Sequence, residues 1–292
     1  MAVERDFDKL WNYDDPAGTE AKFRELLPAA EKGKDKAYYI ELLTQLARTQ
    51  SLQRKFTEAH EILDKAMKLI TAEHIVPRIR FMLERGRTYN SSKEYEKARE
   101  LFHAAYTQAE KYGEDNLAID AVHMLGIVDK GEDSLKWNNL AIEMAERTKD
   151  EKARGWLGPL YNNTGWTYHD MGEYDRALSL FERNVTWHTE RKSGMQLYIA
   201  KWSVARCLRS LGRVEEALEI QMALRGNENE MYSCEDGYNA EEIAECLYAL
   251  GRAEEAKPYF SRAYEMLSKD SWVQENDKEK LERLKSLGEA AN

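Results

Sequence analysis

Apolar residues along this chain follow the spacing of amphipathic helices, and one short pattern returns at a nearly constant interval. The pattern ends in alanine in five segments, SLQRKFTEA, NSSKEYEKA, HDMGEYDRA, RSLGRVEEA and YALGRAEEA, whose last residues are Ala59, Ala98, Ala177, Ala217 and Ala256. Successive alanines lie 39 or 40 residues apart, except for one gap of 79 that spans two intervals. The sequence therefore predicts a repeat array, with one further copy near residue 138.

Each copy predicts two helices joined by a short turn. In the first helix a small residue such as Gly86 is followed three positions later by a large one such as Tyr89. In the second helix Ala98, Phe102 and Ala105 recur at i, i+4 and i+7, which places them on one face. This pattern indicates a helical hairpin that packs small side chains against large ones.

The copy near residue 138 is degenerate. Leu125 and Gly126 match the first helix of the other copies, and Ala141 matches the second helix. The distance between these positions is shorter than in the other copies by about one helical turn. We therefore expect a hairpin with a shortened bend at this point.

These residues resemble the tetratricopeptide repeat, a family of helical hairpins with a pattern of large, Leu-Gly, Tyr, Ala, Phe and Ala positions. The two best copies carry the pattern at Met82, Gly86, Tyr89, Ala98, Phe102 and Ala105, and at Tyr161, Thr164, Gly165, Tyr168, Ala177 and Phe181. The interval is longer than the family's usual length of about 34 residues. Asn184 also replaces the last small residue of the second of these copies.

The resemblance implies an all-α fold, a right-handed α-solenoid of about seven antiparallel helix pairs with a C-terminal capping helix, in a single domain. The domain is expected to span residues 1–292, with degenerate copies at 1–36 and 116–153, further copies at 37–75, 76–115, 154–193, 194–233 and 234–270, and the cap at 271–292. The expected cap spaces Leu281, Leu284 and Leu287 by three along a charged helix.

Two glycines in the best copy predict local geometry. Glycine inside a helix costs about 1 kcal/mol relative to alanine, so Gly165 indicates a place where a neighbouring helix approaches too closely for a side chain. Gly172 falls at the turn, where a left-handed backbone is favourable for glycine. Tyr168 and Phe181 are then expected to pack between the two helices.

Charge and composition narrow the function classes. The formal net charge of -10 argues against non-specific binding of nucleic acid or an anionic membrane. The first residues lack the basic start of a signal peptide, and no apolar stretch approaches a membrane-spanning length, so we expect a cytoplasmic protein. Cys207, Cys234 and Cys246 show no CxxC spacing, which predicts reduced, packed thiols rather than disulfides or a zinc site.

Motifs for catalysis are missing from the sequence. It contains no Gly-rich phosphate loop, no HExxH helix, no GxSxG elbow and no EF-hand loop. We therefore expect a protein that is not an enzyme and that carries no metal and no cofactor. The enzyme alternative rests on two neighbouring pairs, His169 with Asp170 and Asp120 with His123, because a carboxylate can orient an imidazole.

The resemblance also implies a binding surface, because the first helices of stacked repeats form an inner wall that usually holds an extended peptide or a partner's helix. Carried over copy by copy, the candidate wall residues are Arg48, Arg80, Arg87, Asn90, His123, Asn162, Trp166, His169, Trp202, Arg206 and Arg209. Arginine suits carboxylates and tryptophan supplies broad apolar area. We therefore predict a protein interaction scaffold that binds a protein or peptide segment, acidic in character, in this groove.

Other interpretations remain open at this point. The arginines could instead neutralise carboxylates of the chain itself, with Arg80, Arg87 and Arg206 acting on Glu84, Asp120 and Glu241. The chain could also form a homo-oligomer through its ends or convex face. Chaperone-tail clamps require other residues where Arg48 and Thr44 stand. Bacterial peptide-pheromone regulators have similar long repeats together with an added DNA-binding or effector domain, for which we expect no room.

Overall fold

The computed structural model describes residues 5–226 and 236–289, and every regular element within these ranges is a helix. The chain divides into two compact units, unit 1 (Met1–Trp156) and unit 2 (Leu157–Asn292), which are described separately. The all-α prediction is confirmed, and so is the arrangement of helices in consecutive pairs. The extent of a single domain stays a prediction.

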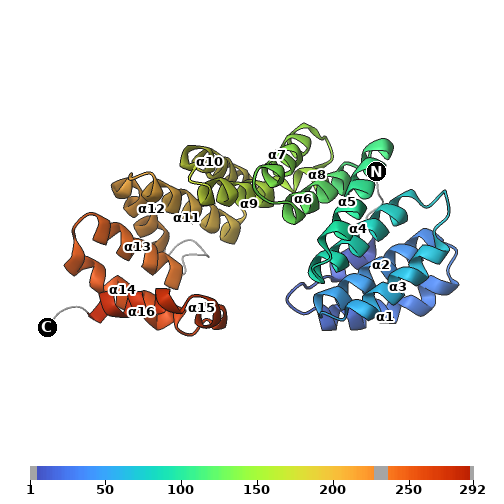
Figure 1. Cartoon of the computed structure of the whole chain (residues 1–292), viewed down its shortest axis with the longest axis horizontal. Helices are drawn as coiled ribbons and strands as arrows, with labels where there is room; N and C mark the ends of the chain where they lie inside the picture. The colour runs from blue at the N-terminus through green and yellow to red at the C-terminus, as the bar shows by residue number, and fades with distance from the viewer. Residues whose placement is uncertain (1–4, 227–235, 290–292) are drawn as a thin grey trace. The chain divides into compact units, whose positions relative to one another are not determined.

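Unit 1 contains three complete hairpins behind a leading helix (Figure 1). Its elements are η1 (Asp6–Leu10, a 3-10 helix), α1 (Pro16–Lys32), α2 (Lys36–Leu52), α3 (Phe56–Leu69), α4 (Ile75–Ser91), α5 (Tyr95–Tyr112), α6 (Asp115–Val128), α7 (Gly131–Arg147) and α8 (Glu151–Arg154). The hairpins are α2 with α3, α4 with α5 and α6 with α7. Helix α1 packs on α2, as expected for the second helix of a degenerate first copy.

Unit 2 repeats the same plan and ends in two shorter helices. Its elements are α9 (Leu157–Asp170), α10 (Tyr174–Glu190), α11 (Gly194–Ser210), α12 (Val214–Gly226), α13 (Gly237–Ala249), α14 (Ala253–Leu267), α15 (Ser271–Asn276) and α16 (Lys278–Glu289). Helix α16 packs on α14 through Leu284, which is fully buried, while Leu281 and Leu287 pack against the same cluster. The predicted cap is therefore present.

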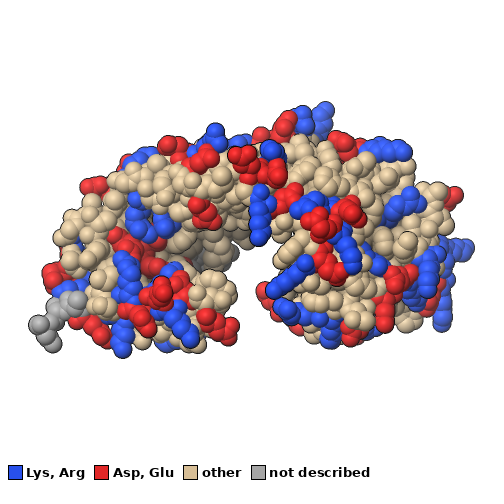
Figure 2. All heavy atoms as spheres, in the orientation of Figure 1, with Lys and Arg blue, Asp and Glu red and all other residues tan. Residues whose placement is uncertain are grey.

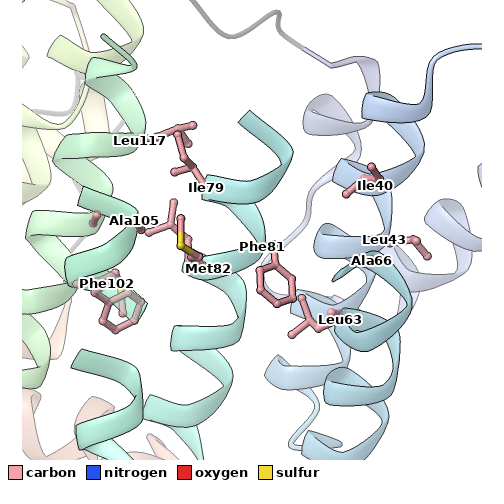
Figure 3. Close-up of a cluster of buried hydrophobic side chains, with 14 of the residues drawn as sticks. Ile40, Leu43, Leu63, Ala66, Ile79, Phe81, Met82, Phe102, Ala105 and Leu117 are labelled. Carbon is pink, nitrogen blue, oxygen red and sulfur yellow. The ribbon is translucent and has the colours of Figure 1, made fainter. Parts of the chain in front are cut away.

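One continuous hydrophobic cluster holds the hairpins of unit 1 together (Figure 3). Ile40 and Leu43 come from α2, Leu63 from α3, Met82 from α4 and Phe102 from α5. Because side chains of successive hairpins share one core, each hairpin buries the apolar face that its neighbour cannot cover alone.

Glycine and phenylalanine make the closest contact inside the two best hairpins. A Cβ atom built on Gly165 of α9 would lie 2.5 Å from Cε1 of Phe181 in α10, and one on Gly86 of α4 would lie 2.5 Å from Cε1 of Phe102 in α5. Both phenylalanines are fully buried. The prediction for Gly165 is therefore confirmed, since any larger residue there would collide with an aromatic ring.

The degenerate hairpin makes the corresponding contact with a polar side chain. A Cβ on Gly126 would collide with the amide group of Asn138 in α7, which takes the place of phenylalanine. Asn138 Nδ2 donates to Ser134 Oγ at 3.3 Å, and Ser134 Oγ donates to the carbonyl of Gly126 at 2.5 Å. The missing helical turn thus brings a polar group of α7 to the position where other hairpins have an aromatic ring.

The turn glycine and the cysteines also agree with expectation. Gly172 has φ +78°, a left-handed conformation that other residues adopt at a cost.

Cys207 and Cys246 are free and buried, and burial raises the pKa of their thiols to about 11 and about 12, respectively. Cys234 lies outside the described residues. Among the described helices, none combines the length and the apolar character that a bilayer crossing requires.

We expect Gly165→Ala to lower the free energy of unfolding by about 1–3 kcal/mol, because the added methyl group overpacks the contact with Phe181. Urea unfolding followed by circular dichroism measures this loss. In a Phe181→Leu background the same substitution should cost less, since leucine leaves room for the methyl group. Equal stability of Gly165→Ala and the parent would contradict the close contact.

Candidate functional site

Ion pairs join the first helices of unit 1. Arg87 of α4 donates to Glu84 Oε1 at 2.7 Å and also to Asp120 of α6. Arg48 of α2 lies 3.8 Å from Glu84 Oε2. Burial alone would lower the pKa of Arg87, but the charges of Asp120 and Glu84 raise it overall. Three successive hairpins are therefore tied together by a largely buried network of opposite charges.

A second cluster in unit 1 centres on Arg80 of α4. Its Nε lies 3.1 Å from Glu41 Oε2 in α2, and its two terminal nitrogens each donate at 3.2 Å to the carboxylate of Asp8. Glu41 is buried, and burial raises its pKa against the opposing charges of Arg5 and Arg80. Arg80 is thus shared between a helix of the repeat and the segment before α1.

His123 of α6 packs beside an indole ring. Its ring is 5.4 Å from that of Trp156, and its Nδ1 is buried without a hydrogen-bond partner among the described residues. Burial lowers the pKa of His123, opposed by the charge of Asp120 and assisted by that of Arg87. Because Asp120 is engaged by Arg87, the suspected pair of Asp120 and His123 does not resemble a catalytic dyad.

The first helices of unit 2 carry aromatic rings beside a smaller buried charge cluster. Trp166 of α9 lies 6.0 Å from Trp202 of α11 between ring centroids, and 5.0 Å from Phe181. Both indoles are half-buried. Asn162 Oδ1 and Trp202 Nε1 are buried and have no hydrogen-bond partner in the described part of the chain. This surface therefore combines apolar area with one unpaired acceptor and one unpaired donor.

Beside the aromatic pair, one glutamate holds two arginines. Glu242 of α13 accepts two hydrogen bonds from Arg209, at 2.8 and 2.9 Å, and lies 3.1 Å from Nε of Arg206. Arg206 Nη1 also donates to Ser210 Oγ at 2.6 Å. The bidentate pair fixes α11 against α13, while Arg206 retains partial exposure of 26%.

His169 and Asp170 do not form a catalytic triad with Ser210. His169 Nε2 is 2.9 Å from Ser210 Oγ, but Nδ1 is 3.8 Å from Asp170 Oδ1, which is too long for a hydrogen bond. The side chain of Asp170 is 80% exposed, so it does not fix the imidazole. Burial lowers the pKa of His169, as does the charge of Arg206. This contact positions Ser210 and Arg206.

The structure places the candidate wall residues on two separate units. Unit 1 carries Arg48, Arg80, Arg87, Asn90 and His123, and unit 2 carries Asn162, Trp166, His169, Trp202, Arg206 and Arg209. Asn90 lies half-buried in the last turn of α4. All five arginines have carboxylate neighbours. Their role in ligand binding stays a prediction.

The ion-pair partners differ from those proposed from sequence. Arg87 does meet Glu84 and Asp120, but Arg80 binds Glu41 and Asp8, and Arg206 binds Glu242 rather than Glu241. On the face drawn in Figure 2, basic and acidic side chains intermingle. The expected basic lining is therefore balanced by carboxylates that come from neighbouring helices.

Sequence reasoning missed three acidic residues that matter here, namely Asp8, Glu41 and Glu242. Glu41 lies in the first helix of its copy, in register with Arg80 in the first helix of the next copy, so the repeat alignment could have identified it. Glu242 of α13 instead meets two arginines of the preceding first helix, α11, at a different register. Asp8 lies outside the repeat pattern, and no periodic signal marks it. Within the described residues, no three His, Cys, Asp or Glu side chains are grouped to hold a metal ion.

Comparison with known proteins agrees with this architecture. A family model described as tetratricopeptide repeat matches residues 160–193, which lie within α9, α10 and the turn that follows. No match was found among curated protein sequences.

Several solved structures share the fold at low identity. The apo form of RapI has a TM-score of 0.72 at 15% identity, covering 96% of this chain and 79% of its own. A STAND signal-transduction ATPase with a tetratricopeptide repeat sensor, from Pyrococcus horikoshii, has a TM-score of 0.72 at 13% identity, covering 93% of this chain but only 42% of its own. NprR in complex with its cognate peptide NprX has a TM-score of 0.51 at 18% identity, covering 98% and 85%. Residues 160–193 thus match a tetratricopeptide repeat, and the chain shares its all-helical repeat fold with these structures.

Removing the Arg87 side chain should destabilise the fold, because its buried carboxylate partners lose their counter-charge. We expect Arg87→Leu to lower the free energy of unfolding by about 3–5 kcal/mol, because Glu84 and Asp120 remain largely buried without their partner. Arg213→Leu is the matched control, since the exposed pair of Arg213 with Glu216 should contribute less than about 1 kcal/mol. Urea titration measures both, and equal losses would contradict the network's importance.

Stability should also fall on mild acidification. The folded pKa of His123 lies below the value of about 6.5 for an unfolded chain, so the unfolded state binds more protons and stability rises with pH through this window. We expect unfolding free energy to decrease from pH 7.5 to 5.5, measured by urea titration. His123→Gln should reduce the decrease, and an unchanged pH slope would contradict the assignment.

Proposed function

We propose that this protein is a non-enzymatic interaction scaffold that binds an extended peptide or partner segment on the first helices of unit 2, over α9 and α11. The observation that carries the proposal is the half-buried pair of Trp166 and Trp202 beside the unpaired Asn162 Oδ1 and Trp202 Nε1. An unpaired buried polar atom costs about 1–3 kcal/mol. A peptide that supplies partners for both atoms removes this cost, so binding is favoured over the empty surface.

The two unpaired atoms suit the main chain of a peptide. Asn162 Oδ1 can accept from a peptide N–H group, and Trp202 Nε1 can donate to a peptide carbonyl. Small rotations of these half-buried side chains bring both atoms to the ligand. Because main-chain groups recur in every peptide, this pair of contacts gives affinity, and the flanking side chains give specificity.

Apolar area next to these atoms supplies the remaining affinity. Met195 and Ile199 are 41% and 45% exposed on α11, at helical spacing from Trp202. Aromatic anchors with nearby apolar residues are typical of binding hot spots. Because an extended peptide loses its own conformational freedom on binding, we expect a Kd in the micromolar range, about -8 kcal/mol.

An acidic residue in the ligand fits Arg206. Its Nε lies 3.1 Å from Glu242 Oε1, its Nη1 donates to Ser210 Oγ, and its side chain is 26% exposed. A ligand carboxylate at the exposed part of this guanidinium would share Arg206 with Glu242. The ligand is therefore expected to carry one acidic residue near the aromatic anchors rather than a long acidic run.

The likeness to NprR, whose solved complex contains its cognate peptide NprX, supports a peptide ligand for this fold. The tetratricopeptide repeat sensor named for the Pyrococcus horikoshii ATPase supports a role in molecular recognition. We propose a cytoplasmic location and no nucleic-acid or membrane partner, in keeping with the net charge of -10. Self-association stays a lesser alternative.

The proposal is tested with a peptide library displayed on phage and selected on the full chain. Selected peptides are expected to bind Trp202→Ala at least tenfold more weakly in calorimetry, a loss of about 1.4 kcal/mol. Trp202→Phe, which keeps the ring but removes the N–H donor, should lose less. Met222→Ala is the matched control, because Met222 is an exposed apolar residue of α12. Peptides that bind the Trp202→Ala and Met222→Ala variants equally well would refute the site.

A further inference from the structure

The segment before α1 lies against the first helices of unit 1. Residues 5–13, here called the N-terminal segment, contain only the short helix η1 and are held mainly by side chains. Phe7 of this segment is fully buried, with its ring 6.2 Å from Phe23 and 5.1 Å from Tyr38. The Tyr38 hydroxyl donates to Asp6 at 2.9 Å. The ring of Phe7 therefore anchors this end of the segment beside α2.

Charged groups flank this anchor on both sides. Arg5 donates to Glu41 Oε1 at 3.1 and 2.7 Å, and to Asp35 Oδ2 at 2.9 Å. Asp8 accepts two hydrogen bonds from Arg80 and lies 3.7 Å from Nζ of Lys152. Glu41 and Arg80, whose side chains are 2% and 11% exposed, also contact each other. The segment therefore satisfies a built pair of opposite charges on α2 and α4.

The contacts continue along the face of the same helices. Trp11 Nε1 donates to Gln45 Oε1 of α2 at 3.0 Å, and Tyr13 stacks on Trp11 with centroids 4.8 Å apart. Tyr13 is 66% exposed, and burial together with the charge of Glu84 raises the pKa of its hydroxyl against the opposing charge of Arg48. The N-terminal segment thus extends from Glu41 to the edge of the Arg48 network, across positions where the sequence predicts a ligand.

We propose that the N-terminal segment acts as an intramolecular ligand of unit 1. The site that it occupies recognises four side chains in order. These are an arginine (Arg5), an aromatic residue (Phe7), a carboxylate (Asp8) and, three residues later, a tryptophan (Trp11). A partner segment with this chemistry binds the same face after displacing the segment. This site is separate from the surface on α9 and α11, and the proposal does not depend on that surface binding a peptide.

The side chains on the helices favour this occupant over a purely acidic one. Glu41 binds a cation of the segment and Arg80 binds an anion of it, in addition to their contact with each other, so the site accepts one charge of each sign beside an apolar anchor. An acidic run would bring a carboxylate against Glu41 and be repelled. A basic run would meet Arg80 and Lys152 with the same result. The partner is therefore a mixed-charge segment with two aromatic residues.

A labelled peptide of residues 5–15 tests the proposal on the full chain by fluorescence anisotropy. The wild-type chain should bind weakly, because its own segment fills the site. In the Asp8→Asn variant, the chain's own N-terminal segment lacks the negative charge that interacts with Arg80 and Lys152. The labelled peptide should therefore bind this variant at least tenfold more tightly than the wild-type chain. Asp14→Asn, which makes the same change of charge beyond the segment, is the matched control and should behave as wild type.

Two further measurements distinguish a segment that a peptide can displace from a segment that only stabilises the fold. Adding Arg80→Gln to Asp8→Asn should return peptide binding to the wild-type level or weaker, since the peptide's own carboxylate loses its partner. Excess unlabelled peptide should also speed hydrogen exchange in residues 5–13 of the wild-type chain. If Asp8→Asn binds the peptide no better than Asp14→Asn, and if exchange is unaffected by peptide, the proposal is overturned, whatever the stability of the variants.

Discussion

The close approach of two helices at a glycine determines the rest of this structure. Gly165 and Gly86 let the rings of Phe181 and Phe102 pack directly on the backbone of the first helix. Once these rings are seated, the opposite side of the first helix faces away from its partner. That side can then carry side chains chosen for interaction rather than for packing, so the tight internal contact allows the binding surfaces to form.

The two units use these surfaces in different ways. In unit 1 the arginines are matched by buried carboxylates, so their charge contributes to cohesion between hairpins and to holding the N-terminal segment. In unit 2 two tryptophans form a half-buried platform with unpaired polar atoms. Among the described residues, one surface is therefore covered by the N-terminal segment, and the other carries polar atoms that have no partner within the described ranges.

The sequence was sufficient to predict the fold because its signal is periodic. The spacing of Ala98, Phe102 and Ala105 identifies the buried face of a helix without reference to other parts of the chain. The contact of Gly165 with Phe181 was also accessible, since both residues belong to one hairpin. Even the shortened copy followed from the distance between Gly126 and Ala141, although the polar contact with Asn138 did not.

The candidate site was harder to predict because it depends on pairs of residues from different hairpins. That Arg206 meets Glu242 instead of Glu241 is decided by a rotation of about 100° between adjacent positions on α13, which a repeat alignment does not resolve. Asp8 lies outside the repeats, so the repeat interval of the sequence could not predict its contact with Arg80. Trp166 and Trp202 were identified because each falls at a position that the resemblance assigns to the inner wall of a first helix.

The seating of Asp8 also changes how unit 1 assembles. In most repeat proteins each hairpin contacts only its neighbours, so order can spread from any point along the chain. Here Asp8 reaches Arg80, 72 positions away, and Lys152 still farther along. These contacts close a long loop, whose entropic cost is met only after the intervening hairpins have formed. The docking of Asp8 therefore couples hairpins of unit 1 that are far apart in the sequence.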